Sequence, residues 1–276
     1  MGNCVYCGQD AGFLRKMHDI CKEMHEAGQK MITGLVATNI LSQLNIDQLN
    51  KTLDEIAEKS FIRKDTIKDL KIAGWEAALN SVLADNFLSI EEENKLAEAR
   101  DKFFFQQNEL DKHGCYTRLV QSSVLREVLE GKIPEKIKID RQPPFNFQKN
   151  EKLVWLFQEV AYYEQKTRKQ FVGGSQGFSM RIAKGVYYRV GAFRGEAVET
   201  TETVKNDVGV LGLTDKNLYF SGKKKSFRVK YGKIVSFIPY SDGIGIHRDV
   251  ASAKPQLFST GDGWFIYNLV TNLAKL

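Results

Sequence analysis

The hydrophobic pattern of the chain changes near its middle. Between residues 26 and 134, apolar positions recur at helical spacing, and no stretch alternates as strands do. Ser89 and Glu92 match a capping box, which opens one of the helices. We therefore expect a helical bundle over residues 29–141, with the aromatic run Phe103–Phe105 inside a helix and packed in the core.

The second half starts with helical spacing and then takes the period of strands. Its first apolar residues indicate one amphipathic helix: Leu153, Leu156, Phe157, Val160 and Ala161. Seven short runs rich in aromatic and β-branched residues predict antiparallel strands: 178–183, 186–191, 208–214, 217–222, 226–231, 234–240 and 243–248. Residues 261–276 predict a final helix that presents large apolar side chains.

Composition and charge narrow the classes of protein. The 276 residues are 42% hydrophobic and 27% charged, which is ordinary for a globular protein. No uninterrupted apolar run is long enough to span a membrane, and no basic segment precedes an apolar run as in a secretory signal, so we expect a cytoplasmic protein. Residues 1–150 carry 21 basic and 23 acidic side chains, whereas residues 151–276 carry 19 and 11. An anionic partner is therefore expected at the second half.

Three of the four cysteines and two of the four histidines lie within the first 28 residues. Cys4 and Cys7 form a CxxC turn, and a helix expected over residues 13–26 carries the next candidates. A ligand pair from a tight turn and a pair from a helix can complete a tetrahedral zinc site. We predict a Zn²⁺ site made of Cys4, Cys7, His18 and Cys21. The alternative set has His25 in place of His18.

Other chemistry fits this segment less well. A cytoplasmic location disfavours a disulfide, and no strand precedes Cys4 as it would in a thioredoxin-type redox pair. Gly2 permits N-myristoylation with Cys4 as a palmitoylation site, but Tyr6 stands where that motif has Ser or Thr. A closed site of four protein ligands leaves no position for water, so the metal would order the segment and not act as the catalyst.

These elements predict an α+β fold with three folded parts. Residues 1–28 form a zinc finger and residues 29–141 a helical domain. The prolines of QPPFNF indicate a linker over residues 142–150. Residues 151–276 then form a small antiparallel β-barrel or sandwich, which is capped by the C-terminal helix.

The run LTDKNLYFSGKKKSFRVKYGKIVSFIPYSDGIGIHRD, within the stretch that begins at Gly209, resembles bacterial pleckstrin-homology-like (PH-like) and GRAM-like domains. The stretch FVGGSQGFSMRIAKGVYYRVGAFRG resembles the segment that precedes this core in a subset of them. The resemblance implies the PH-like fold for about the last 125 residues. Domains of this fold make contacts with lipids, peptides or other copies, so the resemblance alone assigns no activity.

Seven basic residues and no acidic residue lie between positions 166 and 194, interleaved with aromatic residues. This combination suits an anionic lipid headgroup, a nucleic-acid backbone or an acidic protein face. The Gly-rich run at positions 173–177 is expected at a hairpin tip. We predict that an anion or a protein partner is bound by Lys166, Arg168, Lys169, Arg181, Lys184, Arg189 and Arg194.

In its order of domains, the chain resembles the ring-activated zinc-finger RNase type of anti-phage effector. This resemblance implies a bacterial defence protein that recognises a phage protein assembly, forms a homo-oligomer on it and degrades RNA through the finger. RNA cleavage needs groups for proton transfer and a cation for the phosphate. His25 and Glu23 are the candidates for proton transfer, and Arg15 and Lys16 are the candidates for the phosphate.

The alternative function is a non-enzymatic zinc-containing adaptor. Its C-terminal domain would bind anionic lipid headgroups on a membrane surface, or a protein partner. The sequence contains no nucleophile elbow, P-loop, HExxH motif or paired-carboxylate signature, so a conventional enzyme with a substrate pocket is not expected.

Overall fold

The computed structural model describes residues 2–276 except 43–44, 136–142, 173–174, 184–185, 194–195 and 251–253. The chain divides into two compact units, Met1–Lys132 and Ile133–Leu276. The first unit covers the predicted finger and the predicted helical domain as far as Lys132. Among the helices that the structure describes, none combines the length and the apolar character needed to cross a bilayer.

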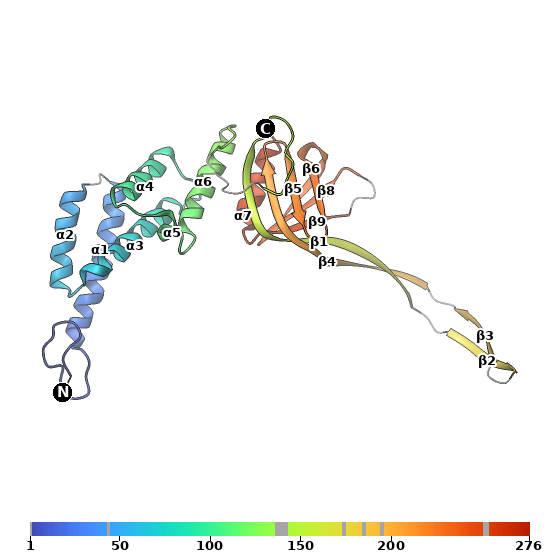
Figure 1. The fold of residues 1–276 in the computed structure, drawn as a ribbon, viewed down its shortest axis with the longest axis horizontal. Coiled ribbons are helices and arrows are strands. Elements are labelled where there is room, and N and C mark those ends of the chain that lie inside the picture. Colours follow the sequence, from blue (N-terminus) through green and yellow to red (C-terminus); the bar gives the residue numbers. More distant parts are fainter. Residues whose placement is uncertain are drawn as a thin grey trace. The chain divides into compact units, whose positions relative to one another are not determined.

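The first unit is a helical bundle that follows two N-terminal loops (Figure 1). Its helices are α1 (Asp19–Leu41), α2 (Ile46–Lys59), α3 (Lys64–Val82), α4 (Ile90–Lys102), α5 (Gln107–Leu110) and α6 (Cys115–Leu129). Ile32, Leu53 and Trp75 are fully buried in its core. The indole of Trp75 donates a hydrogen bond of 3.0 Å to the carbonyl of Leu96, so burial of this large side chain leaves no unpaired donor.

Helix ends account for the differences from the prediction. The predicted capping box at Ser89 and Glu92 is present. The helix expected from residue 13 instead begins at Asp19 and continues without a break to Leu41, because His18 has extended backbone and acts as its N-cap. Helix α4 ends before the aromatic run. Phe104 has a φ of +57° and is 82% exposed, so only its two neighbours pack against the core.

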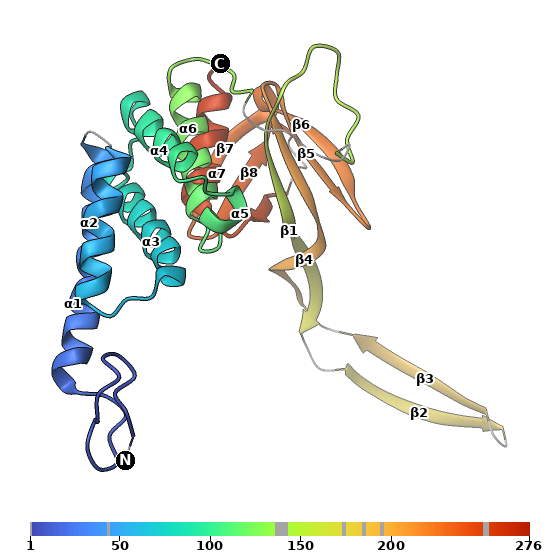
Figure 2. The same cartoon turned by 60° about the vertical axis from the view of Figure 1, so that its left-hand side comes forward.

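The second unit contains one open antiparallel sheet (Figure 2). Its strands are β1 (Leu153–Val172), β4 (Glu196–Thr214), β5 (Asn217–Gly222), β6 (Ser226–Lys230), β7 (Ile234–Tyr240), β8 (Gly243–Arg248) and β9 (Gln256–Ser259). Their order is β6-β5-β4-β1-β9-β8-β7, so β6 and β7 are the edges. Two further strands, β2 (Ser175–Ala183) and β3 (Val186–Phe193), pair with each other.

The core of this unit is aromatic. Helix α7 (Gly263–Leu273) packs on β7 and β8 and inserts Phe265 against Trp155, with ring centroids 4.8 Å apart. On the same sheet, Tyr162 contacts the rings of Phe220 and Phe258. The expected C-terminal helix and all seven expected strand runs are confirmed, whereas β9 was not predicted. A closed barrel is not confirmed, because the seven-stranded sheet is open between its edge strands β6 and β7.

Residues 153–161 form the first part of β1, so the predicted amphipathic helix is wrong. The register against β4 slips between Phe157 and Val160, where Glu159 has a φ of +55°. A bulge changes the face on which the following residues lie. The buried residues of β1 therefore do not keep the two-residue alternation of a regular strand: Val154, Trp155, Phe157, Val160 and Tyr162.

The segment predicted as a linker packs on the sheet where the structure describes it. Phe145 and Phe147 both contact the ring of Tyr219, at centroid distances of 5.4 and 5.3 Å. A side chain at Gly212 would meet the Phe145 ring, with an added Cβ 2.8 Å from it. This part of the segment therefore belongs to the packed surface of the second unit.

Helices α1 and α3 approach so closely at Gly74 that one added methyl group is expected to lower the free energy of unfolding. A Cβ at Gly74 would lie 2.6 Å from the Cβ of Val36, whereas a Cβ at the exposed Gly34 meets nothing within 4 Å. We expect Gly74→Ala to lower the free energy of unfolding by about 1–3 kcal/mol. Gly34→Ala, the matched control on a helix surface, should raise it by about 0.5–1 kcal/mol. Urea unfolding followed by circular dichroism tests both, and equal effects would contradict this packing.

Candidate metal centre

Two short loops and the start of α1 bring four ligand atoms together. The first loop turns tightly after Cys4, whose carbonyl accepts a 2.9 Å hydrogen bond from the N–H of Gly8. Gly8 has a φ of +73°, a conformation that glycine adopts without strain. The N–H of Cys4 donates to the carbonyl of Gln9 at 2.7 Å, and this bond fixes the return of the chain.

Cys4, Cys7, His18 and Cys21 lie close enough to bind a metal ion, because their ligand atoms are all within 4.8 Å of one another. Nδ1 of His18 is 3.4 Å from the sulfur of Cys7 and 3.6 Å from that of Cys21. Cys4 and Cys21 are buried, and the other two are half-buried. The predicted ligand set is thus brought together, and His25, the alternative ligand, is not part of this group.

His18 is held with its Nδ1 toward the three sulfurs. Its Nε2 lies 3.0 Å from the carbonyl of Asp10, which can only accept, so Nε2 donates and Nδ1 keeps its lone pair. This is the outer hydrogen bond that metal-binding histidines usually make. Sequence reasoning missed Asp10, because a backbone carbonyl has no residue signature.

The thiols of the cluster differ in acidity. Burial acts to raise the pKa of Cys4, but hydrogen bonds from the backbone N–H groups of Cys7, His18 and Tyr6 outweigh it and lower the pKa to about 6. Burial and the neighbouring Cys7 sulfur raise the pKa of Cys21 to about 11. A metal ion binds thiolates, so loading this site must displace at least the proton of Cys21 at neutral pH.

His25 joins the metal-binding loops to the helical core. Its Nδ1 donates to the carbonyl of Ser60, between α2 and α3, at 3.0 Å. Its Nε2 then accepts from the amide of Gln29 at 3.2 Å, and its ring lies 4.6 Å from that of Tyr6. Both ring nitrogens of the predicted catalytic histidine therefore have partners within the chain.

The other predicted catalytic residues are exposed. Nη1 of Arg15 lies 3.7 Å from a carboxylate oxygen of Asp19, and Lys16 follows on the same loop. Glu23 is two residues before His25 on α1, and such residues point about 200° apart on a helix. The structure therefore places Arg15 and Lys16 together but does not bring Glu23 to His25.

The loop before His18 also exposes two large apolar side chains that sequence reasoning missed. Phe13 is 82% and Leu14 is 89% exposed. Leu14 has a φ of +59°, which is uncommon for a residue with a Cβ. The loop is tied down by a 3.0 Å bond from Val5 N–H to the Lys16 carbonyl. An ordered apolar tip thus stands directly before two cations.

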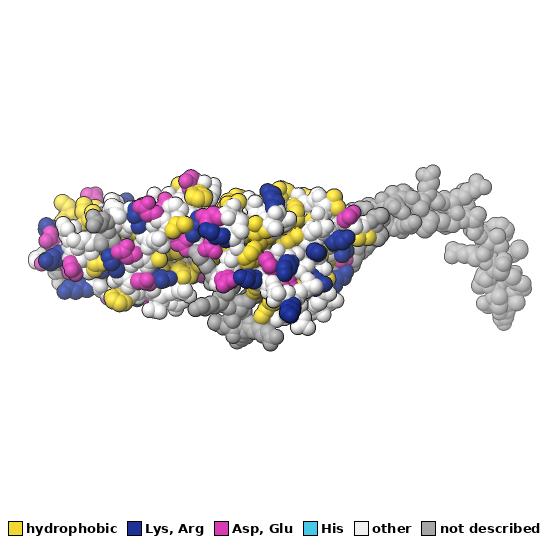
Figure 3. Space-filling view, turned by 90° about the horizontal axis from the view of Figure 1, so that it is seen from above, with side chains coloured by type: hydrophobic (Ala, Val, Ile, Leu, Met, Phe, Trp, Pro, Cys, Tyr) yellow, Lys and Arg dark blue, Asp and Glu magenta, His cyan; other side chains and the backbone are white. Residues whose placement is uncertain are grey.

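Of the seven basic residues predicted to bind an anion or partner, five lie on strands and two lie outside the described residues: Lys166, Arg168 and Lys169 on β1, Arg181 on β2, Arg189 on β3, and Lys184 and Arg194 outside. On β1 and β4, Lys166 pairs with Glu202 and Lys169 with Glu199. On the face shown in Figure 3, basic and acidic side chains of the described residues are likewise interspersed.

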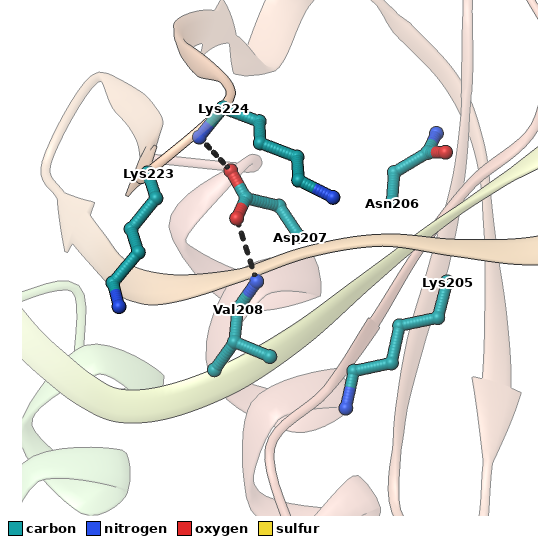
Figure 4. Close-up of a pocket in the computed structure, with 6 residues that line it drawn as sticks. All are labelled: Lys205, Asn206, Asp207, Val208, Lys223 and Lys224. Carbon is teal, nitrogen blue, oxygen red and sulfur yellow. Dashed lines mark hydrogen bonds between the residues drawn. The ribbon is translucent and has the colours of Figure 1, made fainter.

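A pocket of about 490 Å³ lies beside β4, where three lysines surround one carboxylate (Figure 4). It is lined by Lys205, Asn206, Asp207, Val208, Lys223 and Lys224. Burial acts to raise the pKa of Asp207, but backbone N–H groups of the β5–β6 turn, including that of Lys224 at 2.7 Å, lower it. The carboxylate thus orders the turn, while the exposed lysine side chains remain available to an anion.

A comparison with protein-family models gives no match to this chain, and a comparison with curated proteins gives none either. The geometry of the two sites therefore carries the functional argument.

The ligand geometry predicts about one metal ion per purified chain, measured by elemental analysis. His18→Ala should weaken metal binding by at least about tenfold, since even outer hydrogen bonds of such sites contribute that much. His113→Ala is the matched control, because His113 is an exposed histidine that contacts Glu76 and lies outside the cluster. A His25→Ala variant that loses the metal while His18→Ala keeps it would contradict this assignment.

Proposed function

We propose that the protein is an RNA-directed effector of a bacterial defence or stress response, whose N-terminal metal module makes the contact with RNA. The metal module comprises residues 2–21, and the ion that it binds is zinc. Three thiolates and one imidazole form a donor set that zinc takes in closed structural sites. In this role the metal fixes the loops, and the chemistry belongs to the side chains around them.

The observation that carries this proposal is the ordered tip at Phe13 and Leu14. Apolar side chains in water are costly to maintain, and here one of them also requires an uncommon backbone conformation. An exposed aromatic ring can stack on an unpaired base, which contributes about 1–3 kcal/mol per base. The cations of Arg15 and Lys16 follow directly and suit the phosphates on either side of that base.

Cleavage is the second step of the proposal, and His25 is its general base. The imidazole takes the proton of a 2′-hydroxyl, and the 2′ oxygen attacks phosphorus. The 5′ oxygen leaves with a proton from water, which yields a 2′,3′-cyclic phosphate and a 5′-hydroxyl end. Nε2 of His25 must first exchange its hydrogen bond from Gln29 for the substrate, so an inactive resting state is expected. Glu23 has no part in this step, since it lies on another side of α1.

The C-terminal unit is proposed to recognise a protein assembly, such as one formed by a phage, and to gather copies of the chain on it. The support is the ribbon formed by β1 and β4. Pairing of β1 with β9 ends at Glu164, whereas its pairing with β4 continues to Val172. A ribbon that continues beyond the pairing of β1 with β9 offers its backbone edges to a partner without disturbing the core. Gathering copies would raise the effective concentration of a weakly binding tip.

The lysine pocket favours a second candidate, an adaptor that binds anionic headgroups. Lys205, Lys223 and Lys224 are exposed at its rim, and Asp207 is the one acid among its lining residues. Lysines near an anionic membrane contribute about 1 kcal/mol each. This function requires neither RNA nor His25, so the two candidates are separable by experiment.

For RNA binding, we expect Phe13→Ala to weaken the affinity for single-stranded RNA about tenfold, through loss of one stacked base. Phe104→Ala is the matched control, because Phe104 is also 82% exposed with a positive φ but lies outside the metal module. Fluorescence anisotropy at fixed salt measures both.

Cleavage is tested by incubating RNA with the purified protein, with and without candidate phage assemblies. His25→Ala should abolish cleavage, and His113→Ala should retain it. Intact RNA with every assembly would exclude the ribonuclease, and equal binding by Phe13→Ala and Phe104→Ala would exclude the tip as the RNA contact.

For the adaptor, we expect flotation of the protein with vesicles that contain anionic lipid but not with neutral vesicles. Replacement of Lys223 and Lys224 by Ala should weaken vesicle binding about thirtyfold, at about 1 kcal/mol for each lysine. The control is the double replacement of Lys230 and Lys275, two exposed lysines outside the pocket lining. Equal losses in the two variants would show that net charge, and not the pocket, is responsible.

A further inference from the structure

Helix α1 carries an apolar stripe that neither the metal centre nor the helical core uses. Ile20, Met24 and Met31 are 67%, 42% and 54% exposed, and Ala27 between them is exposed as well. The other side of the helix buries Cys21, Gly28, Ile32, Val36 and Ile40. Two distinct apolar faces therefore run along one helix, and the structure accounts for one of them.

The spacing of this stripe is that of a two-helix seam. Positions 20, 24, 27 and 31 are separated by four, three and four residues, which is the alternation of the d and a positions of a heptad repeat. They extend for about 16 Å along α1 at 1.5 Å per residue. We propose that this stripe, together with Glu23 and Lys30, is a contact surface for a second copy of the chain, in antiparallel orientation.

The flanking charges select that orientation. Glu23 and Lys30 occupy successive g positions beside the stripe, and both are exposed. Neither forms a salt bridge within the part of the chain that the structure describes. In an antiparallel pair, Glu23 of each copy lies near Lys30 of the other, which gives two ion pairs. In a parallel pair, g positions face e positions, and Glu23 would face Gly28.

These charges also favour a second copy over an unrelated partner. One surface carries both members of the ion pair and both halves of the apolar seam, so it is complementary to itself about a two-fold axis. A seam of three large side chains and one alanine is short, and association is expected to be weak and dependent on concentration. The contact places the two metal modules at opposite ends of the seam, and it does not depend on whether the modules bind RNA.

The test is sedimentation velocity of the full metal-loaded chain over a concentration series up to about 1 mM. We expect a monomer–dimer equilibrium that Met24→Glu weakens at least tenfold. Leu129→Glu, at an exposed leucine near the end of α6, is the control and should leave the equilibrium unchanged. Metal content and circular dichroism establish that each variant is folded.

Charge exchange then tests the orientation. Glu23→Lys and Lys30→Glu should each weaken the dimer severalfold, and the double variant should restore it, because the ion pairs reform with reversed sign. A monomer at every concentration would overturn the proposal, as would a dimer that Met24→Glu leaves intact. Failure of the double variant to restore association would overturn the antiparallel arrangement. None of these outcomes depends on RNA binding, so they are separate from the fate of the proposed function.

Discussion

Residues 2–18 have almost no core of their own, so the order of their loops would come from metal ligation at Cys4, Cys7, His18 and Cys21. Among the described residues at this end of the chain, the buried cluster consists of Cys4, Ala11 and Cys21, two of which belong to the candidate metal site. The side chains that pack against it are only half-buried: Tyr6, Cys7, Met17 and Phe61. So small an apolar cluster cannot offset the conformational entropy of two ordered loops. The positions of the Phe13–Leu14 tip, of Arg15 and of the N-cap of α1 therefore all follow from whether the four ligands meet.

Features that are determined by residues close together in the chain could be predicted from the sequence. A CxxC turn followed by His18 and Cys21 was sufficient to predict which four side chains lie close enough to bind one metal ion. Ser89 and Glu92 were sufficient to predict a helix start. In both cases the residues that form the pattern lie within a short stretch of the chain. Prediction failed where long-range pairing decides the local structure. The apolar residues on either side of the bulge at Glu159 have a helical spacing in the sequence, so the first part of β1 was predicted as a helix. Strand β9 has only four residues, and no local sequence signal indicates its pairing with β1 and β8.

The same limit applies to the functional residues. The basic residues at 166–194 looked unopposed in the sequence, yet the register of β1 and β4 places acidic residues from a later segment opposite two of them. The lysine pocket is the converse case, since it joins residues 205–208 to residues 223–224 through a turn that Asp207 holds. Charge in a β-rich unit therefore has to be counted along the sheet and not along the chain.

The hydrogen bond between His25 and Ser60 has a consequence for cooperativity. It connects the end of α2 to a helix whose start carries two residues of the candidate metal site, His18 at the N-cap and Cys21. Metal binding at one end of α1 and packing at its other end are thus thermodynamically linked. Occupancy of the metal site would therefore shift the melting temperature of the helical bundle. A change in the supply of a metal ion that this site binds would then act on the whole first unit as a ligand acts on a binding protein, through mass action on the folded state.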